Sequence, residues 1–470
     1  MPPSLAIFAC MIGIAGLFYL DRDKTVRTSK VLWLPVIWFW IVGSRPVSFW
    51  VGGGPSLTDP QMLDGSPTDR NVFLVLLTLG IITLIGRRRS VVPLLKANKP
   101  ILIFFGFALL SLLWSSYPDI TFKRWTKAIG DVAMVLVLVT DADPIGALRR
   151  FLARTGFILL PLSIVFIKYL DIGRGYDPDG NPANTGLTTN KNVLGVVTFV
   201  ITLGALWRIL TLLRSKRSPA RSRQMMAQVV LLACGIALLN MAHSATSEAC
   251  FALGAVLMIV TGFRGIRRRP AAVHAVVGAL ASSAGIIILS GGMALLTHAV
   301  GRQENFTGRT EIWSAVFRGV DNPLLGAGFE SFWLGPRLAR VWSGLSGYMH
   351  VNEAHNGYLE EYLNLGWVGL ILLAVILIAA YVRAVRVFRR DPSTGGLMLA
   401  FAVTAVIYST TEAGFRMLNP MWFFLLLTEV GSLGLISYAS NRAQENRSRC
   451  GSSETDAVSA ERHLIVPVEL

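Results

Sequence analysis

Residues 308–313 read Gly308-Arg309-Thr310-Glu311-Ile312-Trp313, residues 322–328 read Asn322-Pro323-Leu324-Leu325-Gly326-Ala327-Gly328, and residues 353–360 read Glu353-Ala354-His355-Asn356-Gly357-Tyr358-Leu359-Glu360. All three lie in one polar interval, residues 298–362, between hydrophobic runs that are too apolar to stay in water. An arginine and a histidine beside a membrane surface can hold a phosphate and manage a proton. This interval is therefore the candidate site of chemistry in the chain.

The composition outside this interval is that of a membrane protein. The chain has 470 residues, of which 53% are hydrophobic and 15% are charged, and its mean hydropathy is +0.54. In a soluble protein, about a quarter of the residues would be charged. Apolar runs of about 17 to 25 residues recur along the sequence. We expect an all-α, polytopic integral membrane protein with about 12 to 14 transmembrane helices, rather than a string of soluble domains.

The expected spans fall near residues 4–20, 31–52, 71–86, 100–117, 125–140, 151–170, 192–213, 226–243, 249–263, 272–299, 364–384, 397–411 and 419–438. These are thirteen expected spans, and because thirteen is odd, the two ends of the chain should lie on opposite sides of the membrane. Four segments follow. Residues 1–298 hold about ten spans and an outward loop at 171–191. Residues 299–362 form a large outward loop with amphipathic helices, residues 363–440 hold the last spans, and residues 441–470 form a polar tail that we expect to be disordered.

The net charge of +16 raises the alternative of a nucleic-acid surface. The basic residues, however, cluster in short loops between the expected spans, at 22–30, 87–89, 149–154, 214–223, 264–269 and 383–390. These are alternate loops, which is the positive-inside pattern. The sequence therefore predicts no nucleic-acid partner and a cytoplasmic C-terminus. It also predicts that the N-terminus and the 300s loop lie outside. The first apolar run lacks a basic leading segment, so we expect a retained helix rather than a signal peptide.

The cysteines give no support for a disulfide framework or a metal site. Cys10, Cys234 and Cys250 lie within apolar runs, and Cys450 lies in the tail. None lies in an expected outward loop, and no metal-ligand spacing occurs. We expect neither a metal nor another cofactor.

Two further outward segments carry cations with open interpretations. Lys127 and Asp131 are four residues apart, which favours a helical salt bridge. Alternatively, Arg124 or Lys127 contacts an anionic lipid headgroup. Lys191 directly precedes an expected helix, where backbone N–H groups and the helix dipole favour an anion. It is therefore either part of a phosphate pocket or a snorkelling interfacial lysine.

The short turn at residues 243–248 places polar groups near membrane depth, where they are costly and often functional. The plainer interpretation is that Thr246 or Ser247 caps the next helix. We favour the plainer interpretation for Glu248, and for the two hydroxyls both interpretations stay open.

Residues 307–320 have the apolar spacing of an amphipathic helix at the membrane surface, with Arg309 in its first turn. A basic side chain there opposes the helix dipole unless an anion binds to it. The alternative for Arg309 is a salt bridge to Glu304 or Glu311. His355 lies between acidic neighbours at the start of a span. If its segment is helical, it shares a face with Tyr358, Leu359 and Tyr362. His350 has no such setting.

Taken together, these motifs resemble the O-antigen ligase and polymerase family of bacterial membrane glycosyltransferases. The resemblance rests on Gly308-Arg309 with Trp313, on Asn322-Pro323 with Gly326 and Gly328, and on His355-Asn356 with Tyr358-Leu359, followed by Gly366 and Gly369. Thr189-Asn190-Lys191-Asn192 with Gly195, and Ser244 with Thr246, resemble its exopolysaccharide-polymerase branch. The motifs run from about residue 188 to residue 369. Lys191 stands where ligases tend to have an arginine, and Asn190 where that branch commonly has a histidine.

The resemblance implies a GT-C-like helical fold in the bacterial inner membrane with one large periplasmic loop. It implies transfer of a glycan from undecaprenyl pyrophosphate to a sugar hydroxyl, with inversion and without a metal. Arg309 and His355 are then the expected catalytic residues, and Arg309, Lys191 and Arg124 bind the pyrophosphate. Asn192, Asn356, Tyr358 and Glu311 are expected to contact substrate.

The expected partners are the lipid-linked oligosaccharide, the glycan acceptor and membrane lipids, with a chain-length regulator and a flippase as further candidates. The alternative function is that of a polysaccharide transporter or flippase without catalysis. That function predicts ionisable residues near the middle of the bilayer and inverted repeats. The strongest polar residues of this chain instead lie in the outward loops or at their edges.

Overall fold

The computed structural model describes residues 2–23, 26–52, 66–176, 180–269, 271–289, 307–345 and 351–436. His350, the start of the 300s loop and the tail from 441 lie outside the described residues. The first helices are α1 (Pro3–Leu20), α2 (Trp33–Val42), α3 (Val47–Trp50), α5 (Pro67–Gly86), α6 (Arg88–Ala97), α7 (Lys99–Leu110), α8 (Pro118–Val139) and α9 (Pro144–Tyr169). A hairpin of β1 (Arg174–Tyr176) and β2 (Pro182–Asn184) follows, with Gly175 opposite Ala183.

The second half begins with α10 (Lys191–Leu213), α11 (Pro219–Ala242), α12 (Ala245–Thr261), α13 (Arg264–Arg268) and α14 (Ala272–Leu289). It continues with α16 (Thr307–Arg318), α17 (Gly335–Ser343), α18 (Gly357–Arg390) and α19 (Pro392–Tyr408), and a last helix covers Pro420–Ile436. The structure is thus almost entirely helical, as the sequence predicts for an all-α polytopic membrane protein.

Within the described part of the chain, six helices are long and apolar enough to cross a membrane: α1, α5, α9, α10, α11 and α18. The pair formed by α6 and the helix after it passes the same test as a seventh, but is bent by 83°. Five shorter apolar helices accompany them. The expected span 31–52 is broken, because Gly43 and Pro46 separate α2 from α3. The total of 12 to 14 spans stays a prediction.

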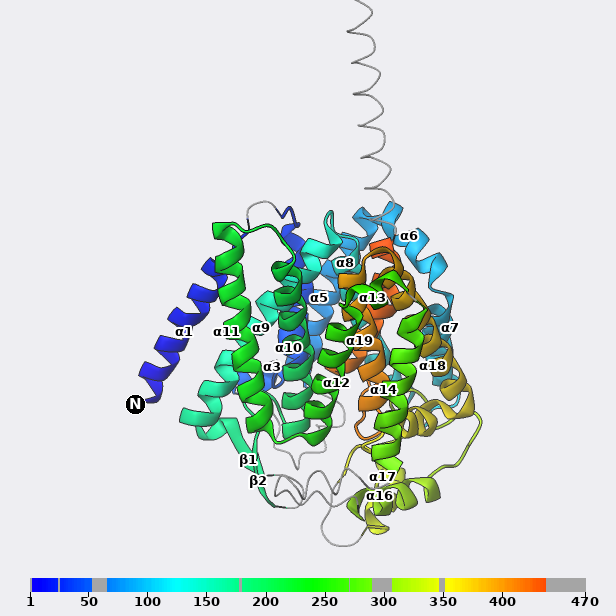
Figure 1. The fold of residues 1–470 in the computed structure, drawn as a ribbon. Helices are drawn as coiled ribbons and strands as arrows, with labels where there is room; N and C mark the ends of the chain where they lie inside the picture. Colours follow the sequence, from blue (N-terminus) through cyan, green and yellow to red (C-terminus); the bar gives the residue numbers. More distant parts are fainter. Residues whose placement is uncertain are drawn as a thin grey trace, which may run out of the picture.

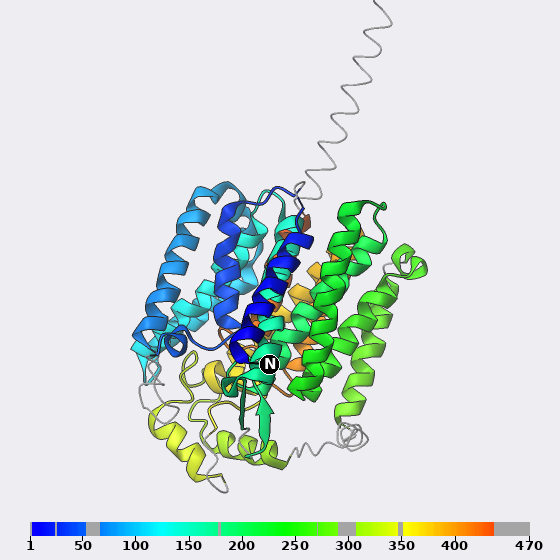
Figure 2. The ribbon, with the colours of Figure 1, turned by 90° about the vertical axis from the view of Figure 1, so that its left-hand side faces the viewer.

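The long helices run side by side, as Figure 1 and Figure 2 show from two directions. Helices α16 and α17 and the β-hairpin lie at one end of the bundle, together with the N-terminus, and α6 and α13 lie at the other end. The two loops expected to face outward, 171–191 and the 300s loop, are therefore at the same end. This relative placement agrees with the alternation of basic loops in the sequence.

Burial separates central helices from peripheral ones. The apolar window of α10 is 83% buried, whereas that of α1 is only 17% buried. The centre holds an aromatic cluster in which the ring of Phe39 lies 5.5 Å from Phe151 and 5.4 Å from Phe423, between ring centroids. Such contacts add to the stability that the buried area provides. The apolar surface of α1 faces outward, as expected for a helix against lipid.

The 300s loop has a small hydrophobic core of its own, formed by side chains of α16, α17, the loop between them and the start of α18. Its fully buried members include Val316, Phe332 and Val341. Ile312 is also buried, so the predicted amphipathic helix is present with the expected inward face, although Phe317 is 56% exposed. This core makes the loop a defined platform rather than an irregular connection.

The turn at Asn322–Gly328 fits into a break in α18. Gly366 has φ +63° inside α18, and the amide of Trp367 donates to the carbonyl of Pro323 over 3.0 Å. The amides of Ala327 and Gly328 donate in turn to the carbonyls of Leu363 and Asn364, over 3.0 Å and 2.9 Å. A Cβ on Gly366 would lie 2.3 Å from the carbonyl group of Leu324. The glycines of this motif therefore bring two backbones into direct contact.

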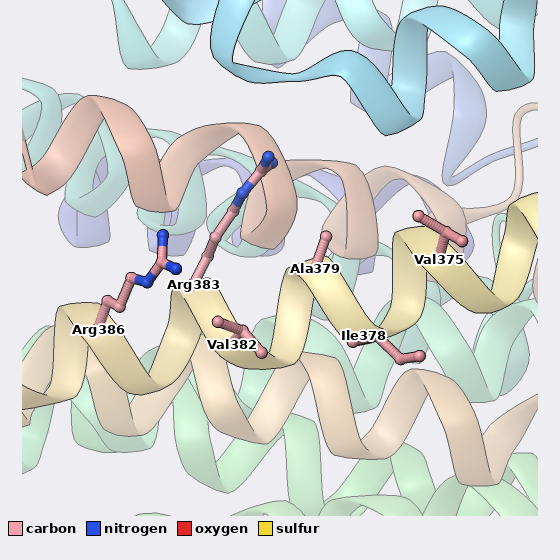
Figure 3. Close-up of a pocket in the computed structure, with 6 residues that line it drawn as sticks. All are labelled: Val375, Ile378, Ala379, Val382, Arg383 and Arg386. Carbon is pink, nitrogen blue, oxygen red and sulfur yellow. The ribbon is translucent and has the colours of Figure 1, made fainter.

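A cavity of about 330 Å³ opens along α18, lined by Val375, Ile378, Ala379, Val382, Arg383 and Arg386. Figure 3 shows Val375 at one end of this row and the two arginines at the other. The guanidinium of Arg383 pairs with Glu429 of the last helix. Val375 lies 18 residues after Gly357, which is about 27 Å along the helix. The cavity thus lies far along α18 from the polar end that carries the sequence motifs.

Candidate functional site

Several sequence motifs meet at one buried carboxylate, that of Glu412. This residue lies in the turn between α19 and the helix Pro420–Ile436, and its side chain is 5% exposed. Arg309 forms a salt bridge to its Oε1 with an Nη2–Oε1 distance of 3.0 Å. Asn192 donates from Nδ2 to its Oε2 over 3.0 Å, and Nδ1 of His355 lies 3.5 Å from the same oxygen. Glu412 therefore joins α10, α16 and the segment before α18.

Local sequence explains how two of these groups are presented. Arg309 lies in the first turn of α16, as predicted. Asn192 lies in the first turn of α10, where the side chain of Asn190 caps the helix by accepting from the amide of Val193 over 2.8 Å. Asparagine is a preferred N-cap residue, so the local sequence is sufficient to explain why the helix starts here.

His355 lies outside the helix that follows it. Asn356 is the N-cap of α18, and its Oδ1 accepts from the amides of Tyr358 and Leu359 over 3.0 Å and 3.1 Å. His355 itself has φ +49°, in the left-handed region. The condition under which His355 would share a helical face with Tyr358, Leu359 and Tyr362 is therefore not met, because the cap at Asn356 begins the helix at Gly357, after His355.

The imidazole of His355 lies between two carboxylates. Its Nδ1 is 3.1 Å from Oε1 of Glu353 and 3.5 Å from Oε2 of Glu412. Burial lowers the pKa of His355 and so does the charge of Arg309, but Glu353 and Glu412 outweigh both and raise the pKa to about 9. The ring is consequently an imidazolium at neutral pH. The site then holds two cations, Arg309 and His355, and two carboxylates.

The same three side chains form the group that could hold a metal ion. The ligand atoms of Glu353, His355 and Glu412 lie within 4.8 Å of one another. A divalent cation there would have to displace the proton of a basic imidazole, and it would lie beside the guanidinium of Arg309. Both requirements oppose metal binding, so the donor set fits a protonated histidine better than an ion.

The other residues predicted to bind substrate lie around this cluster, and each has contacts of its own. Lys191 begins α10 one residue before Asn192, at the end of the helix that reaches Glu412. Arg124 of α8 donates to the backbone carbonyl of Glu330 and so belongs to a neighbouring group of residues. Asn356 donates to the carbonyl of Thr410 over 3.2 Å, and the hydroxyl of Tyr358 donates to that of Val406 over 3.0 Å. Glu311 lies in the first half of α16. The roles of these residues in substrate binding stay predictions.

Two local interpretations of the sequence are wrong. Asp131 does not pair with Lys127. Its fully buried carboxylate accepts from the indole of Trp38 over 2.8 Å and from the amide of Leu418 over 3.1 Å. The helical spacing of residues 127 and 131 holds, but Trp38 and Leu418 are the donors that packing supplies.

In the turn at residues 243–248, the interpretation that Thr246 or Ser247 caps the next helix does not hold either. Helix α12 begins at Ala245, so its N-cap is Ser244, and Thr246 and Ser247 lie inside its first turn. The hydroxyl of Thr246 instead lies 2.9 Å from that of Thr411, next to Glu412. This polar turn thus packs against the segment that carries the central carboxylate.

Sequence reasoning missed Glu412, the residue on which the site is centred. A usable signal was present, because a carboxylate directly follows the expected span 397–411, and ionisable groups at membrane depth are costly unless they serve a function. No periodicity or spacing, however, links it to residues 192, 309 and 355.

Comparisons with known proteins bear on this arrangement. Residues 228–374 match a family model described as O-antigen ligase. The chain is also 26% identical over 354 residues to the exopolysaccharide production protein ExoQ of Rhizobium meliloti (strain 1021), an alignment that covers 71% of this chain and 76% of that protein. Arg309 and His355 lie within the region that matches the family model, whereas Asn192 and Glu412 lie outside it.

Proposed function

We propose that this chain, whose residues 228–374 match a family model described as O-antigen ligase, is a membrane glycosyltransferase of exopolysaccharide or O-antigen synthesis. Its donor is a glycan carried on undecaprenyl pyrophosphate, and its acceptor is a sugar hydroxyl at the periplasmic face of the inner membrane. The similarity to an exopolysaccharide production protein favours polymerisation of repeat units over transfer to a lipid core.

The observation that carries this proposal is the meeting of Arg309, His355 and Asn192 at the buried carboxylate of Glu412. These residues come from separate elements, and they gather at the end of the bundle where the 300s platform lies (Figure 1). A donor held there keeps its isoprenoid chain among the apolar helices while its sugars stay in water. This requirement explains why the enzyme is a membrane protein.

Charge stabilisation is the first task of the site. When the glycosidic bond to phosphate breaks, the departing diphosphate gains negative charge. Arg309 offers a guanidinium that suits phosphate oxygens, and Lys191 adds a cation at the N-terminus of α10, where backbone amides also favour an anion. The buried Glu412 holds Arg309 in place in the absence of donor.

Orientation of the acceptor is the second task. A ring with a pKa of about 9 is protonated at pH 7, so His355 acts as a hydrogen-bond donor rather than as the initial proton acceptor. The imidazolium then orients the acceptor hydroxyl and balances charge on the diphosphate. The side chain of Glu353 is 27% exposed and lies 3.1 Å from the ring, so it is the accessible carboxylate that receives the hydroxyl proton.

The balance of the step is simple. The acceptor oxygen forms a bond to the anomeric carbon, the bond from that carbon to the phosphate oxygen breaks, and the electron pair leaves with the diphosphate. The hydroxyl proton goes to Glu353. Attack opposite the leaving group gives inversion, and no metal takes part.

The experiment is transfer by the purified protein in lipid bilayers, with a lipid-linked repeat unit as donor and acceptor and with chelator present. We expect longer glycans from the wild type and a loss of about 100-fold or more in His355→Ala. Full activity of His355→Ala would refute the mechanism. Absence of any transfer by the wild type, with both substrates verified, would refute the function.

A transport function without catalysis gives a different result in cells. In a strain that lacks this chain, loss of a polymerase leaves single repeat units on the outer face, and loss of a ligase leaves unattached polymer. Loss of a flippase leaves lipid-linked repeats on the cytoplasmic face. The position and length of the accumulated glycan therefore separate the three functions.

A further inference from the structure

The backbone of His355 requires support from its surroundings. Its φ of +49° lies in a region that side chains with a Cβ adopt rarely. In this conformation Nδ1 of the imidazole lies 3.1 Å from Oε1 of Glu353 and 3.5 Å from Oε2 of Glu412. Something outside residue 355 must hold this conformation.

Three side chains, of which Glu360 is buried and Trp313 and Arg416 are half-buried, hold the backbone just before His355. The amide of Ala354 donates to Oε1 of Glu360, and the carbonyl of Ala354 accepts from the indole of Trp313 over 2.9 Å. The carbonyl of Asn352 accepts from Nη1 of Arg416 over 3.1 Å. The peptide groups on either side of residue 353 are thus tied to α18, to α16 and to the turn that also carries Glu412.

Glu360 is itself fixed from the other side. It is 2% exposed, and its Oε2 accepts from the indole of Trp333 over 2.9 Å. It does not contact the imidazole of His355 in the described structure, so any effect on chemistry must pass through the backbone of residues 354 and 355. Arg416 is fixed in a similar way, by two hydrogen bonds to Oε2 of Glu330 over 3.1 Å and 3.2 Å.

We propose that Glu360 is a positioning residue which, through the amide of Ala354, holds His355 in its left-handed conformation between Glu353 and Glu412. This inference rests on the proposed function for its catalytic meaning, although the positioning can be measured without turnover. The groups that face the ring are Glu353 on its own segment, Glu412 on the turn after α19, and Arg309 on α16.

The test compares Glu360→Ala with Glu361→Ala. Glu361 is the next residue on α18 and is also buried, and its Oε1 has no hydrogen-bond partner in the described part of the chain. Both variants remove one buried carboxylate, but only the first removes the acceptor for the amide of Ala354. The measurement is the titration of His355 in histidine-labelled full-length protein in nanodiscs, with its signal among the six histidines identified by its loss in His355→Gln.

In Glu360→Ala we expect the pKa of His355 to fall by about one pH unit or more toward its ordinary value, because the ring moves away from its carboxylates. In Glu361→Ala it should stay as in the wild type. In Glu360→Gln, the side-chain carbonyl oxygen can still accept from the amide of Ala354, but the N–H₂ group would face the indole N–H of Trp333, which is also a donor. The pKa of His355 should therefore fall less in this variant than in Glu360→Ala. This variant serves as the test if Glu360→Ala does not fold.

Kinetics give a second, independent readout. In Glu360→Ala we expect kcat to fall by about tenfold or more, with KM for the lipid-linked donor within about twofold of the wild type. An unchanged titration of His355 in both Glu360 variants would overturn the proposal. An inactive wild type whose His355 still titrates differently in Glu360→Ala would refute the proposed function and leave the positioning role supported.

Discussion

Glu412 and His355 together decide how charge is arranged at the site. A carboxylate that is 5% exposed needs a cation nearby, and both Arg309 and His355 supply one. In return, the carboxylates keep the imidazole protonated at neutral pH. The charge state and the position of each of these side chains therefore depend on the others. A single substitution should consequently also change the charge or the position of the side chains that remain.

Glu412→Gln should abolish most of the activity. The amide is similar in size, but it cannot neutralise Arg309 or support the imidazolium of His355. We expect a loss of about 100-fold in glycan elongation, measured with the purified enzyme. Asp171→Asn is the control, because Asp171 is fully exposed and, among the residues that the structure describes, forms its salt bridge with Arg174 at the same end of the bundle. Comparable loss in both variants would contradict a specific role for Glu412.

The raised pKa of His355 predicts a pH dependence with a definite sign. If the protonated ring is the active form, kcat should be constant near pH 7 and fall as the pH rises through about 9. The charged ring also stabilises the fold. That contribution should be complete below the ordinary pKa of about 6.5 and lost through pH 9. The measurement is a pH–rate profile beside melting temperatures of the wild type and His355→Gln. A rate that rises through pH 9 would show that the neutral ring acts as the base.

At the level of elements, the start of α18 is where the membrane bundle and the 300s platform join. The turn Asn322–Gly328 occupies the break at Gly366, and hydrogen bonds run in both directions between the two backbones. This contact fixes the platform, with Arg309, relative to the first turns of α18, next to His355. The Asn322–Gly328 motif, one of those that carry the family resemblance, therefore has a packing role.

Gly366→Ala should destabilise the protein. The residue has φ +63°, and a Cβ would lie 2.3 Å from the carbonyl group of Leu324. We expect a cost of about 1–3 kcal/mol from the backbone alone, with a larger total because the turn must move. Gly13→Ala is the matched control, since nothing lies within 4 Å of a Cβ at that position of α1. Equal melting temperatures for the two variants in detergent would contradict this account.

Asp131 links three elements and should be sensitive for a different reason. Asp131→Ala would leave the indole of Trp38 and the amide of Leu418 buried without their acceptor. We expect a loss of about 1–3 kcal/mol for each unsatisfied donor, seen as a lower melting temperature. Asp131→Asn keeps one acceptor and should lose less. Lys127→Ala should leave these hydrogen bonds intact, and a matching loss there would revive the salt-bridge interpretation.

The two ends of the helix bundle carry different elements. The hairpin, α16, α17 and the N-terminus lie at one end, and the basic helix α13 lies with α6 at the other (Figure 1). The positive-inside rule assigns the basic end to the cytoplasm. The candidate site would then face the periplasm, as a lipid-linked donor on that side requires.

Cysteine labelling tests this orientation. Arg340→Cys on α17 and Arg267→Cys on α13 are introduced separately into a chain whose own cysteines are replaced by alanine. A membrane-impermeant maleimide should label Arg340→Cys in cells with a permeable outer membrane, and Arg267→Cys only after the inner membrane is opened. The reverse pattern would place the site in the cytoplasm and exclude the proposed donor side.

Local sequence was sufficient for the membrane class, for most helices, and for the motifs that carry Arg309 and His355. Hydropathy and helix starts depend on neighbouring residues, so a single chain reveals them directly. The left-handed backbone of His355, the partners of Asp131 and the central place of Glu412 were decided only by tertiary structure. Each of these depends on groups far apart in the chain, and no local pattern encodes which helix packs against which. A buried charge takes the partner that packing brings near it, and residues 192, 309, 355 and 412 meet only once the bundle has closed.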